Sequence, residues 1–468
     1  MLKSLTVAFG ETAAGAGSGL GAQAPSASSV NIVKARNLVH HPLIPAKVGT
    51  QKLIIAKFAS EQRPSPSGRG FNAGRGANHA RLPRVQTSKL TFYEFFAGGG
   101  MARLGLGAGW DCAFANDFDP VKAATYRANF TDAAEHFHQG DVFQVEARDL
   151  PARADLAWAS SPCQDFSLAG ARAGLTGGRS SAFFGFWRLV EALGAENRAP
   201  RVLVIENVSG LLTSKGGADF IELARALADQ GYHFGALEVD AADFLPQSRP
   251  RVFVIATLEA PSPRLIGESR YQTRAVKLAA GRLPCELADR WIWWALDAPP
   301  ARNHDLAALL EDDAAVVWHS PERTTRWLDL MAPLHRARLE ARRDRGERIV
   351  GALYRRMRME AGRKVQRAEV RFDGLAGCLR TPRGGSSRQV VAVVEGGQVR
   401  TRLLTSREAA RLMGLPESYN LPKAATSALH VAGDGVATPV VRWLAQELLE
   451  PLLASAPVPH ARTAASRR

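Results

Sequence analysis

Short apolar runs alternate with amphipathic stretches between residues 90 and 257, and this pattern predicts a β/α repeat. Aromatic positions in Thr91–Phe96 indicate a first strand, and the apolar run Leu156–Ala159 indicates a later, buried one. The 3.6-residue period predicts amphipathic helices at Ser181–Leu193 and Ala218–Gln230. Because strands and helices alternate, we expect an α/β fold with a mostly parallel sheet and helices on both faces.

A glycine turn follows the first strand. The turn Ala97–Gly100 precedes a helical stretch at Met101–Ala108, and a second strand at Ala113–Asn116 ends in Asp117. Glycines allow a ligand to approach the backbone closely, and an acid that ends the second strand can accept both hydroxyls of a ribose. The order strand, glycine turn, helix, strand and acid predicts a nucleotide-binding βαβ unit. Glycine turns after strands also occur for packing alone.

Cys163 follows the buried strand Leu156–Ala159, in a loop that Ser160–Pro162 begin. Open α/β sheets place their chemistry at the carboxyl ends of strands. A lone free cysteine is more often a small buried hydrophobe than a nucleophile, so its position alone does not indicate catalysis. Strands at Arg201–Ile205 and Arg251–Thr257 continue the sheet.

The β/α rhythm fails from Leu258 to about Asp373. A tryptophan-rich stretch, RWIWWALDAPP, is followed by HRARLEARRDRGERIVGALYRRMRME, which we interpret as basic helices. So long an interruption predicts an inserted or appended module. Regular structure resumes at Leu404–Pro416, where Ser406 can cap a helix, and an amphipathic helix at Thr438–Leu453 closes the ordered chain.

These changes of pattern divide the chain into five expected parts. They are a disordered basic extension at residues 1–88, a core at 89–257, an inserted region at 258–378, a return to the core at 379–453 and a disordered tail at 454–468.

The net charge of +15 is concentrated in two places. Residues 1–88 hold 11 Lys/Arg against two acids, and residues 323–371 hold 15 against six, so the remainder is slightly acidic. This distribution predicts a polyanionic partner met at defined surfaces. The alternative is that the arginine-rich stretches are only solvated faces.

The cysteines predict neither disulfides nor a metal site. They are scattered, without a CxxC pair or a histidine at ligand spacing, at Cys112, Cys163, Cys285 and Cys378. No apolar run approaches the roughly 18 residues that a membrane helix needs. We therefore expect reduced thiols in a cytoplasmic protein.

Six motifs, taken in order, resemble those of the cytosine-5 DNA methyltransferases, over roughly residues 92–257 and 379–452. Phe96-Ala97-Gly98-Gly99-Gly100 is similar to the FxGxG cofactor turn, Pro162-Cys163-Gln164 to the catalytic PCQ, Glu206-Asn207-Val208 to ENV, Gln247-Ser248-Arg249-Pro250-Arg251 to QxRxR, Arg402 with Glu408–Pro416 to RLxxxEaxrlxGxP, and Gly433–Val436 to the closing GNxV. The chain departs from the family at Glu94 for Asp, at Ser160-Ser161 before PCQ, and at Asp434 for Asn.

The resemblance implies a covalent mechanism. Carbon 5 of cytosine is a poor nucleophile, so the Cys163 thiolate would first add at carbon 6. Glu206 would hydrogen-bond to ring nitrogen 3 as charge develops on the ring. Arg249 and Arg251 would hold the pyrimidine carbonyl, a backbone phosphate or the thiolate, and Gln247 would orient them.

The resemblance also implies S-adenosylmethionine as methyl donor, with no metal, bound in a Rossmann-like domain that carries a smaller inserted target-recognition domain. The residues implied are Phe96, Gly98 and Gly100 for the amino-acid part, Asp117 for the ribose, Asp141 for the adenine amino group, and Pro162 and Asp434 elsewhere around the cofactor. Residues 89–257 would then be the catalytic core and residues 258–378 the region that reads the target.

The implied substrate is double-stranded DNA, because a base inside a duplex must be flipped out before its ring can be attacked. We expect a monomer in a bacterial or phage-encoded setting, associated with the nucleoid, with a separately acting restriction endonuclease as a compatible partner. A transfer-RNA cytosine-5 methyltransferase is the first alternative, and the large basic insert disfavours it. A silent DNA-binding subunit is the second, disfavoured because Cys163, Glu206 and Arg251 are intact. The glycine turn alone would also fit an oxidoreductase, but no hydride-transfer residues accompany it.

Overall fold

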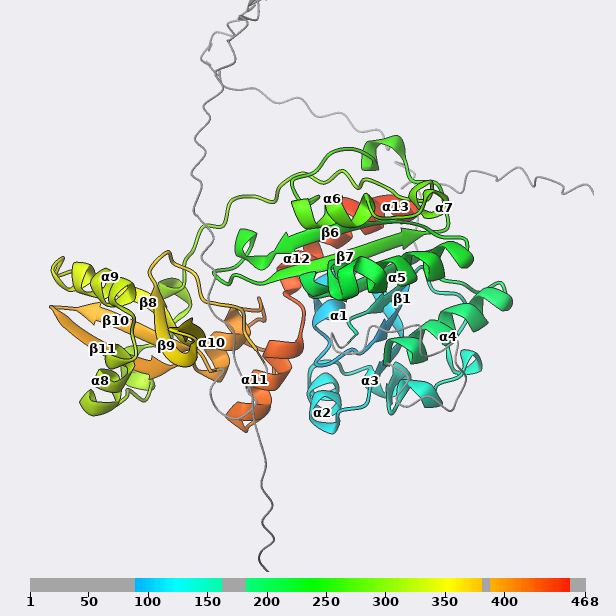
Figure 1. Ribbon diagram of the computed structural model, residues 1–468. Coiled ribbons are helices and arrows are strands. Elements are labelled where there is room, and N and C mark those ends of the chain that lie inside the picture. The colour runs from blue at the N-terminus through cyan, green and yellow to red at the C-terminus, as the bar shows by residue number, and fades with distance from the viewer. Residues whose placement is uncertain (1–88, 162–181, 381–387, 455–468) are drawn as a thin grey trace, which may run out of the picture. The chain divides into compact units, whose positions relative to one another are not determined.

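The computed structural model describes residues 89–161, 182–380 and 388–454. Within these ranges the larger of two sheets has seven strands, in the order β3-β2-β1-β4-β5-β7-β6 (Figure 1). They are β1 (Leu90–Phe95), β2 (Trp110–Asp117), β3 (Phe137–Gln139), β4 (Leu156–Ala159), β5 (Val202–Asn207), β6 (His233–Asp240) and β7 (Pro250–Thr257). Strand β7 runs antiparallel to both neighbours, and the other pairs are parallel. The predicted α/β fold is confirmed, and the strand order reverses at β1 and β4, where open sheets bind ligands.

Helices cover both faces of this sheet because alternate residues of each strand point to opposite sides. In β1, Phe92 packs into one hydrophobic cluster and Tyr93 and Phe95 into another. The helices on the Phe92 side include α1 (Met101–Leu106), α12 (Thr438–Leu444) and α13 (Glu450–Ala454). Those on the other side are α4 (Ala182–Ala195), α5 (Ala218–Asp229), α6 (Arg274–Ala280) and α7 (Cys285–Ala288). Helices α2 (Pro120–Asn129) and α3 (Ala133–His136) pack beside β2.

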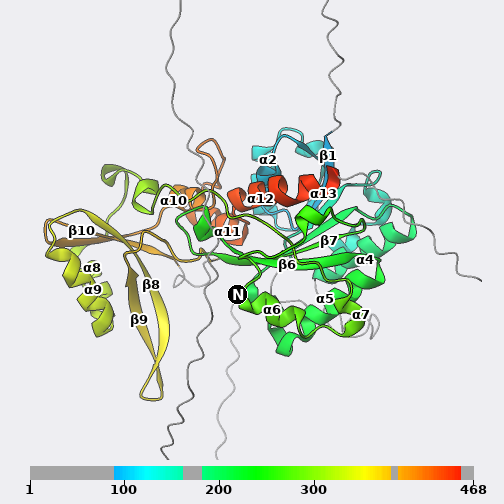
Figure 2. The same ribbon diagram turned by 90° about the horizontal axis from the view of Figure 1, so that it is seen from above.

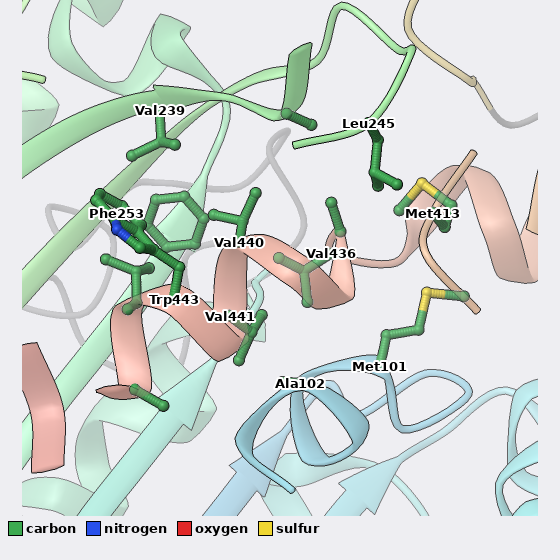
Figure 3. Close-up of a cluster of buried hydrophobic side chains, with 14 of the residues drawn as sticks. Met101, Ala102, Val239, Leu245, Phe253, Met413, Val436, Val440, Val441 and Trp443 are labelled. Atoms are coloured by element: carbon green, nitrogen blue, oxygen red, sulfur yellow. The ribbon is translucent and has the colours of Figure 1, made fainter. Parts of the chain in front are cut away.

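The carboxyl-terminal helix returns to the first helix of the fold, as predicted. Figure 3 shows Val436 and Val440 of this segment in one apolar cluster with Met101 and Ala102 of α1. A Cβ at Gly435 would lie 2.1 Å from the Met101 sulfur, so the close approach requires glycine there. A π-helical turn, Ala445–Leu449, joins α12 to α13.

A second, antiparallel sheet has the order β11-β10-β8-β9 among the described residues. Its strands are β8 (Ile349–Glu360), β9 (Arg363–Arg371), β10 (Val390–Glu395) and β11 (Gln398–Leu403), and α8 (Pro321–Asp329) and α9 (Pro333–Arg343) pack on it through Trp327 and Leu339. Hydrogen bonding therefore carries this sheet past residue 378 to residue 403. The division of the chain at the expected residue numbers stays a prediction.

The segment expected to form basic helices is helical only in its first half. Helix α9 ends at Arg343, whereas the stretch GALYRRMRME lies in β8. Gly346 adopts φ +72°, which breaks the helix, and Ala361 and Gly362 both have positive φ, as a two-residue hairpin turn requires. Arginine-rich composition suits either structure, and pairing with β9 and β10 makes this stretch a strand.

Two further details differ from expectation. Thr405, not Ser406, caps α10 (Ser406–Arg411): its hydroxyl accepts a hydrogen bond from the Glu408 amide, and Glu408 reciprocates in a capping box. Strand β6 was not predicted at all. The tryptophan-rich stretch packs against it, because Phe234 pairs with Trp291.

The remaining elements are short. They comprise α11 (Ala425–Asp434) and 3₁₀ turns at Val142–Gln144, Ala147–Asp149, Ser209–Leu212, Ser214–Gly217, Ala241–Asp243, Pro263–Leu265, Ala307–Leu309 and Asp313–Ala315. None of the helices in the described ranges is long and apolar enough to cross a membrane.

Candidate active site

The expected nucleophile, Cys163, and its neighbour Pro162 lie outside the described residues. The described chain reaches Ser161, two residues before the cysteine. The Asn207 side-chain amide donates to the carbonyl and to the hydroxyl of Ser161, each at 3.3 Å, and Ser160 N donates to Phe95 O at 3.3 Å. The end of β5 and the end of β1 therefore fix the point at which the chain leaves β4 toward Cys163.

Glu206 and Arg251 form an ion pair beside this point. Arg251 Nε lies 3.1 Å from Glu206 Oε1, and both side chains are largely buried. Antiparallel pairing of β5 with β7 sets Asn207 opposite Val252, so Arg251 stands one residue beyond the paired end of β5. A carboxylate held by a fixed guanidinium keeps one orientation more readily than a free one.

Arg249 has different neighbours from Arg251. It is 2% exposed, and its guanidinium donates to the carbonyls of Leu379 at 3.1 Å, Gly433 at 3.0 Å and Gly435 at 2.6 Å. Burial, with the nearby Arg251 charge, lowers the pKa of Arg249 to about 10. The two arginines were expected to share a role. The Arg249 guanidinium, however, donates its hydrogen bonds to main-chain carbonyls of residues 379–435, which follow β9 in the chain.

Gln247 likewise contacts the main chain. Its amide donates to Leu412 O at 2.6 Å, and its carbonyl oxygen accepts from Leu379 N at 3.0 Å. Neither of these two hydrogen bonds reaches Arg249 or Arg251, and the orienting role of Gln247 stays a prediction. Gln247 joins the strand before β7 to the segments that follow the second sheet.

The glycine turn between β1 and α1 has the form that a nucleotide site requires. Phe96 adopts φ +59°, a strained value for an aromatic residue, and Gly98 adopts φ +57° with nothing within 4 Å of the position of a Cβ. Gly98 N donates to Asp117 Oδ2 at 2.8 Å. A Cβ at Gly99 would lie 2.3 Å from the Tyr419 hydroxyl, which donates to Gly99 O at 2.7 Å. The turn is thus held from both sides while space remains open at Gly98.

The acids expected to bind the nucleoside lie at the ends of neighbouring strands. Asp117 ends β2, and its burial raises the pKa of its carboxyl group above the ordinary value. Asp141 follows β3, is exposed, and accepts from Phe143 N at 3.0 Å. Phe118, beside Asp117, is 71% exposed. An exposed aromatic ring next to a ribose-binding acid can stack on a base.

Asp434, which replaces the family's asparagine, pairs with Lys122 at 2.8 Å. Burial alone would lower the pKa of Lys122, but the carboxylates of Asp434 and Asp117 outweigh it and raise that pKa. The pair links the end of α11 to the first turn of α2. The lysine supplies the counter-charge that an asparagine would not need.

Glu94, the other acidic departure, is buried beneath α1. Its Oε1 accepts from Arg103 N at 3.4 Å, and Oε2 has no hydrogen-bond partner among the described residues. Burial raises the pKa of Glu94 to about 8, so the group is protonated at neutral pH.

Sequence reasoning did not assign roles to Asn207, Phe118 or Lys122. Asn207 lies inside the ENV motif and could have been found from it, and Phe118 follows directly after Asp117, the acid expected to bind the ribose. Lys122 gave no local signal, because its partner Asp434 is more than 300 residues away. In the parts of the chain that the structure describes, no group of three or more His, Cys, Asp or Glu side chains is arranged to hold a metal.

Comparison with known proteins identifies the family of this chain. The family of C-5 cytosine-specific DNA methylases matches residues 90–450. The type II methyltransferase M.BsuFI of Bacillus subtilis is 34% identical over 36% of this chain and 39% of its own length. M1.ScrFI of Lactococcus lactis subsp. cremoris is 24% identical over 78% of this chain and 80% of its own length. M.DsaV of Dactylococcopsis salina is 27% identical over 78% of this chain and 87% of its own length.

A solved structure supports the fold. The Dnmt2 methyltransferase of S. pombe aligns with a TM-score of 0.50 at 20% identity, over 78% of this chain and 99% of that one. The family match spans well over half of the sequence, including both sheets. The chain therefore belongs to the C-5 cytosine-specific DNA methylase family and is a DNA cytosine-5 methyltransferase.

Proposed function

We propose that the enzyme methylates a flipped-out cytosine in a specific duplex sequence through a covalent adduct of Cys163. The observation that carries the proposal is the buried Glu206–Arg251 pair, at 3.1 Å, next to the Asn207 contact that holds Ser161. These contacts support the proposal because the Glu206 carboxyl group neighbours Asn207, which binds Ser161, two residues before Cys163 in the sequence. That is the arrangement needed for attack on a ring whose charge must be stabilised.

The chemical step balances as follows. The Cys163 thiolate forms a bond to carbon 6, and the electron pair of the 5,6 double bond moves onto carbon 5 and the ring. The carboxyl group of Glu206 gives its proton to nitrogen 3 as negative charge develops on the ring, and Arg251 pairs with the carboxylate that is left. Carbon 5 would then take the donor's methyl group, with the donor leaving as the thioether S-adenosylhomocysteine. A water molecule or hydroxide from solvent removes the carbon 5 proton, the electron pair of that C–H bond re-forms the 5,6 double bond, and the carbon–sulfur bond breaks to release the Cys163 thiolate. The nitrogen 3 proton returns to Glu206.

S-adenosylmethionine, the methyl donor of the family, supplies the electrophilic methyl group when bound. The residues fit it: the open space at Gly98 would allow close approach to the backbone, and Asp117, at the end of β2 beside the glycine turn, would accept the ribose hydroxyls. Asp141 and Phe118 would meet the adenine, and Phe96, Gly100, Pro162 and Asp434 would surround the remainder. Arg249 and Gln247 are proposed as positioning residues for Gly433–Gly435 and Leu379.

The expected biological setting completes the proposal. The substrate is double-stranded DNA, the enzyme acts as a monomer on the bacterial nucleoid or on phage DNA, and a restriction endonuclease with the same target would act separately. Residues 258–378, together with the later strands of the second sheet, would read the target.

A trapping experiment tests the covalent mechanism. Duplex DNA that carries 5-fluorocytosine lacks the removable proton at carbon 5, so enzyme and DNA should stay joined through denaturation when S-adenosylmethionine is present. Cys163→Ser should give no complex, and Glu206→Gln should slow trapping about 100-fold or more. A wild-type enzyme that methylates ordinary DNA but never forms a stable complex would refute the adduct. Trapping on fluorinated transfer RNA, with none on DNA, would refute the choice of substrate.

A further inference from the structure

We propose that the hairpin of β8 and β9 is a DNA-reading ribbon that enters the major groove, with Lys364 and Gln366 determining sequence preference; this rests on the proposed function. The basic ribbon is defined as residues 355–368. Strand β10 pairs with β8 only from Ile349 to Leu353, so beyond that point β8 has β9 as its partner. Figure 2 shows the hairpin projecting from the second sheet.

The composition of the basic ribbon is unfavourable for stability, which indicates a function other than folding. An isolated two-stranded hairpin is marginally stable, because neither face is buried. Met357 is 57% exposed and Met359 is 63% exposed, in a segment that also carries six basic residues and a single acid. Two exposed thioethers on a strongly positive hairpin indicate a partner that is both polyanionic and partly apolar. The edges of DNA bases in the major groove, flanked by phosphates, meet both requirements.

The two faces of the ribbon differ in their chemistry. Directly paired residues of neighbouring strands share a face, so the register defines a methionine face and an arginine face. The methionine face comprises Arg355, Met357, Met359, Lys364, Gln366 and Ala368. The arginine face comprises Arg356, Arg358, Glu360, Arg363, Val365 and Arg367.

Ion pairs occupy most of the arginine face. Glu369 pairs with both Arg356 and Arg358, and Glu360 pairs with Arg367. On the methionine face, by contrast, the described part of the chain offers no hydrogen bond or ion pair to the side chain of Lys364 or Gln366. The methionine face therefore presents free donors, a free acceptor and apolar atoms, which is the set needed to read base edges.

The dimensions fit the groove. The major groove of B-DNA is about 12 Å wide and accepts a two-stranded ribbon. The rungs Met357–Gln366 and Met359–Lys364 are two residues apart, or about 6.8 Å along the strands. That separation equals about two base-pair steps of 3.4 Å. Gln366 suits adenine and Lys364 suits guanine, while the methionines can contact thymine methyl groups.

A basic hollow beside Arg355, where the basic ribbon begins, also fits DNA as the ligand. Its volume is about 360 Å³, and its lining is Ser320, Arg323, Arg326, Trp327 and Arg355. The Arg355 guanidinium lies 4.4 Å from the centre of the Trp327 ring, so the hollow joins the first residue of the methionine face. Three arginines around a polar hollow would hold a backbone phosphate and set the depth of the ribbon in the groove.

The test is the methylation consensus of variants of the full-length enzyme. A random duplex library is methylated to a low extent and sequenced after bisulfite treatment. Gln366→Ala and Lys364→Ala should each raise methylation of wrong-base sites, relative to preferred sites, about tenfold at one position, and the two positions should lie about two base pairs apart. Arg363→Ala, on the other face, should slow all sequences alike and reduce the salt dependence by about one counterion.

Arg338→Ala, an exposed arginine of α9 outside the ribbon, is the control for loss of charge alone and should keep the wild-type consensus. An unchanged consensus in both Gln366→Ala and Lys364→Ala would overturn the proposal while the proposed function stands, since the enzyme would still methylate specific sites. A wild-type enzyme that methylates no duplex in the library would instead overturn the proposed function, and the ribbon with it. Relaxed specificity in Arg338→Ala equal to that of Gln366→Ala would also overturn the ribbon.

Discussion

Replacing each arginine of the QxRxR segment with methionine should affect a different property of the enzyme. Arg249→Met removes a buried guanidinium that donates to three carbonyls and lies 3.4 Å from the Cys378 sulfur. Arg251→Met removes one partner of an ion pair at the edge of the site. The first change should therefore lower stability, and the second should lower turnover.

The magnitude follows from the contacts. A buried carbonyl that loses its partner costs about 1–3 kcal/mol, so three give roughly 3–9 kcal/mol. Removal of a charge whose burial already lowers its pKa to about 10, together with apolar packing by methionine, offsets part of this. We expect a loss of about 3–5 kcal/mol for Arg249→Met and a smaller loss of about 1–3 kcal/mol for Arg251→Met, which leaves the largely buried Glu206 carboxyl group without its partner. Turnover of folded Arg251→Met should fall about 100-fold or more, because the carboxylate loses the group that orients it.

Urea unfolding and single-turnover methylation measure the two effects separately. Arg249→Lys is the matched control, because an ammonium keeps the charge but cannot reach three divergent carbonyls, and it should remain destabilised. If Arg249→Met unfolds within 1 kcal/mol of the wild type, or if Arg251→Met loses more stability than Arg249→Met, the division of roles is wrong.

Three further predictions concern buried groups. Burial raises the pKa of Glu94 to about 8, so the native state holds a proton that the unfolded chain releases. The free energy of unfolding should therefore fall by up to about 1.4 kcal/mol per pH unit as the pH rises from about 4.5 to 8. Urea unfolding at several pH values should show this slope for the wild type and not for Glu94→Gln. Arg402 and Glu408 form a pair in which each side chain is 1% exposed, so Arg402→Met should cost about 3–5 kcal/mol. Glu408→Leu should cost more, because Thr405 N and Glu311 N also lose their acceptor. The double variant should cost less than the sum of the two single losses, and additive losses would contradict this. Gly99→Ala should weaken S-adenosylmethionine binding about tenfold or more by calorimetry, and Tyr419→Phe added to it should restore part of that affinity, because the clash is with the tyrosine hydroxyl.

Local patterns in the sequence predicted five of the seven strands of the larger sheet, all except β3 and β6. Each strand and helix of the β/α repeat depends on short-range periodicity, and Asp119 and Pro120 set the start of α2 where the sequence indicated it. The motif order identified the family and the residues around Glu206, because family motifs are contiguous stretches.

The sequence did not predict the secondary structure of stretches whose composition suits both a helix and a strand. The arginine-rich stretch from residue 349 onward could be a helix or a strand, and the outcome depends on pairing with β9 and β10, which lie later in the chain. Strand β6 is likewise defined by its partner β7, to which it runs antiparallel. Sheet pairing is a contact between distant residues, so local propensity does not decide it.

Only the tertiary structure separated Arg249 from Arg251. Two residues apart in the sequence, they were expected to act alike. The carbonyls that surround Arg249 come from residues 379, 433 and 435, more than 100 positions away, whereas the carboxylate that meets Arg251 comes from the neighbouring strand. The sequence determined which groups are present, and the folded chain determined which partner each charge meets, because a guanidinium acts on whatever acceptor the packing brings within about 3 Å.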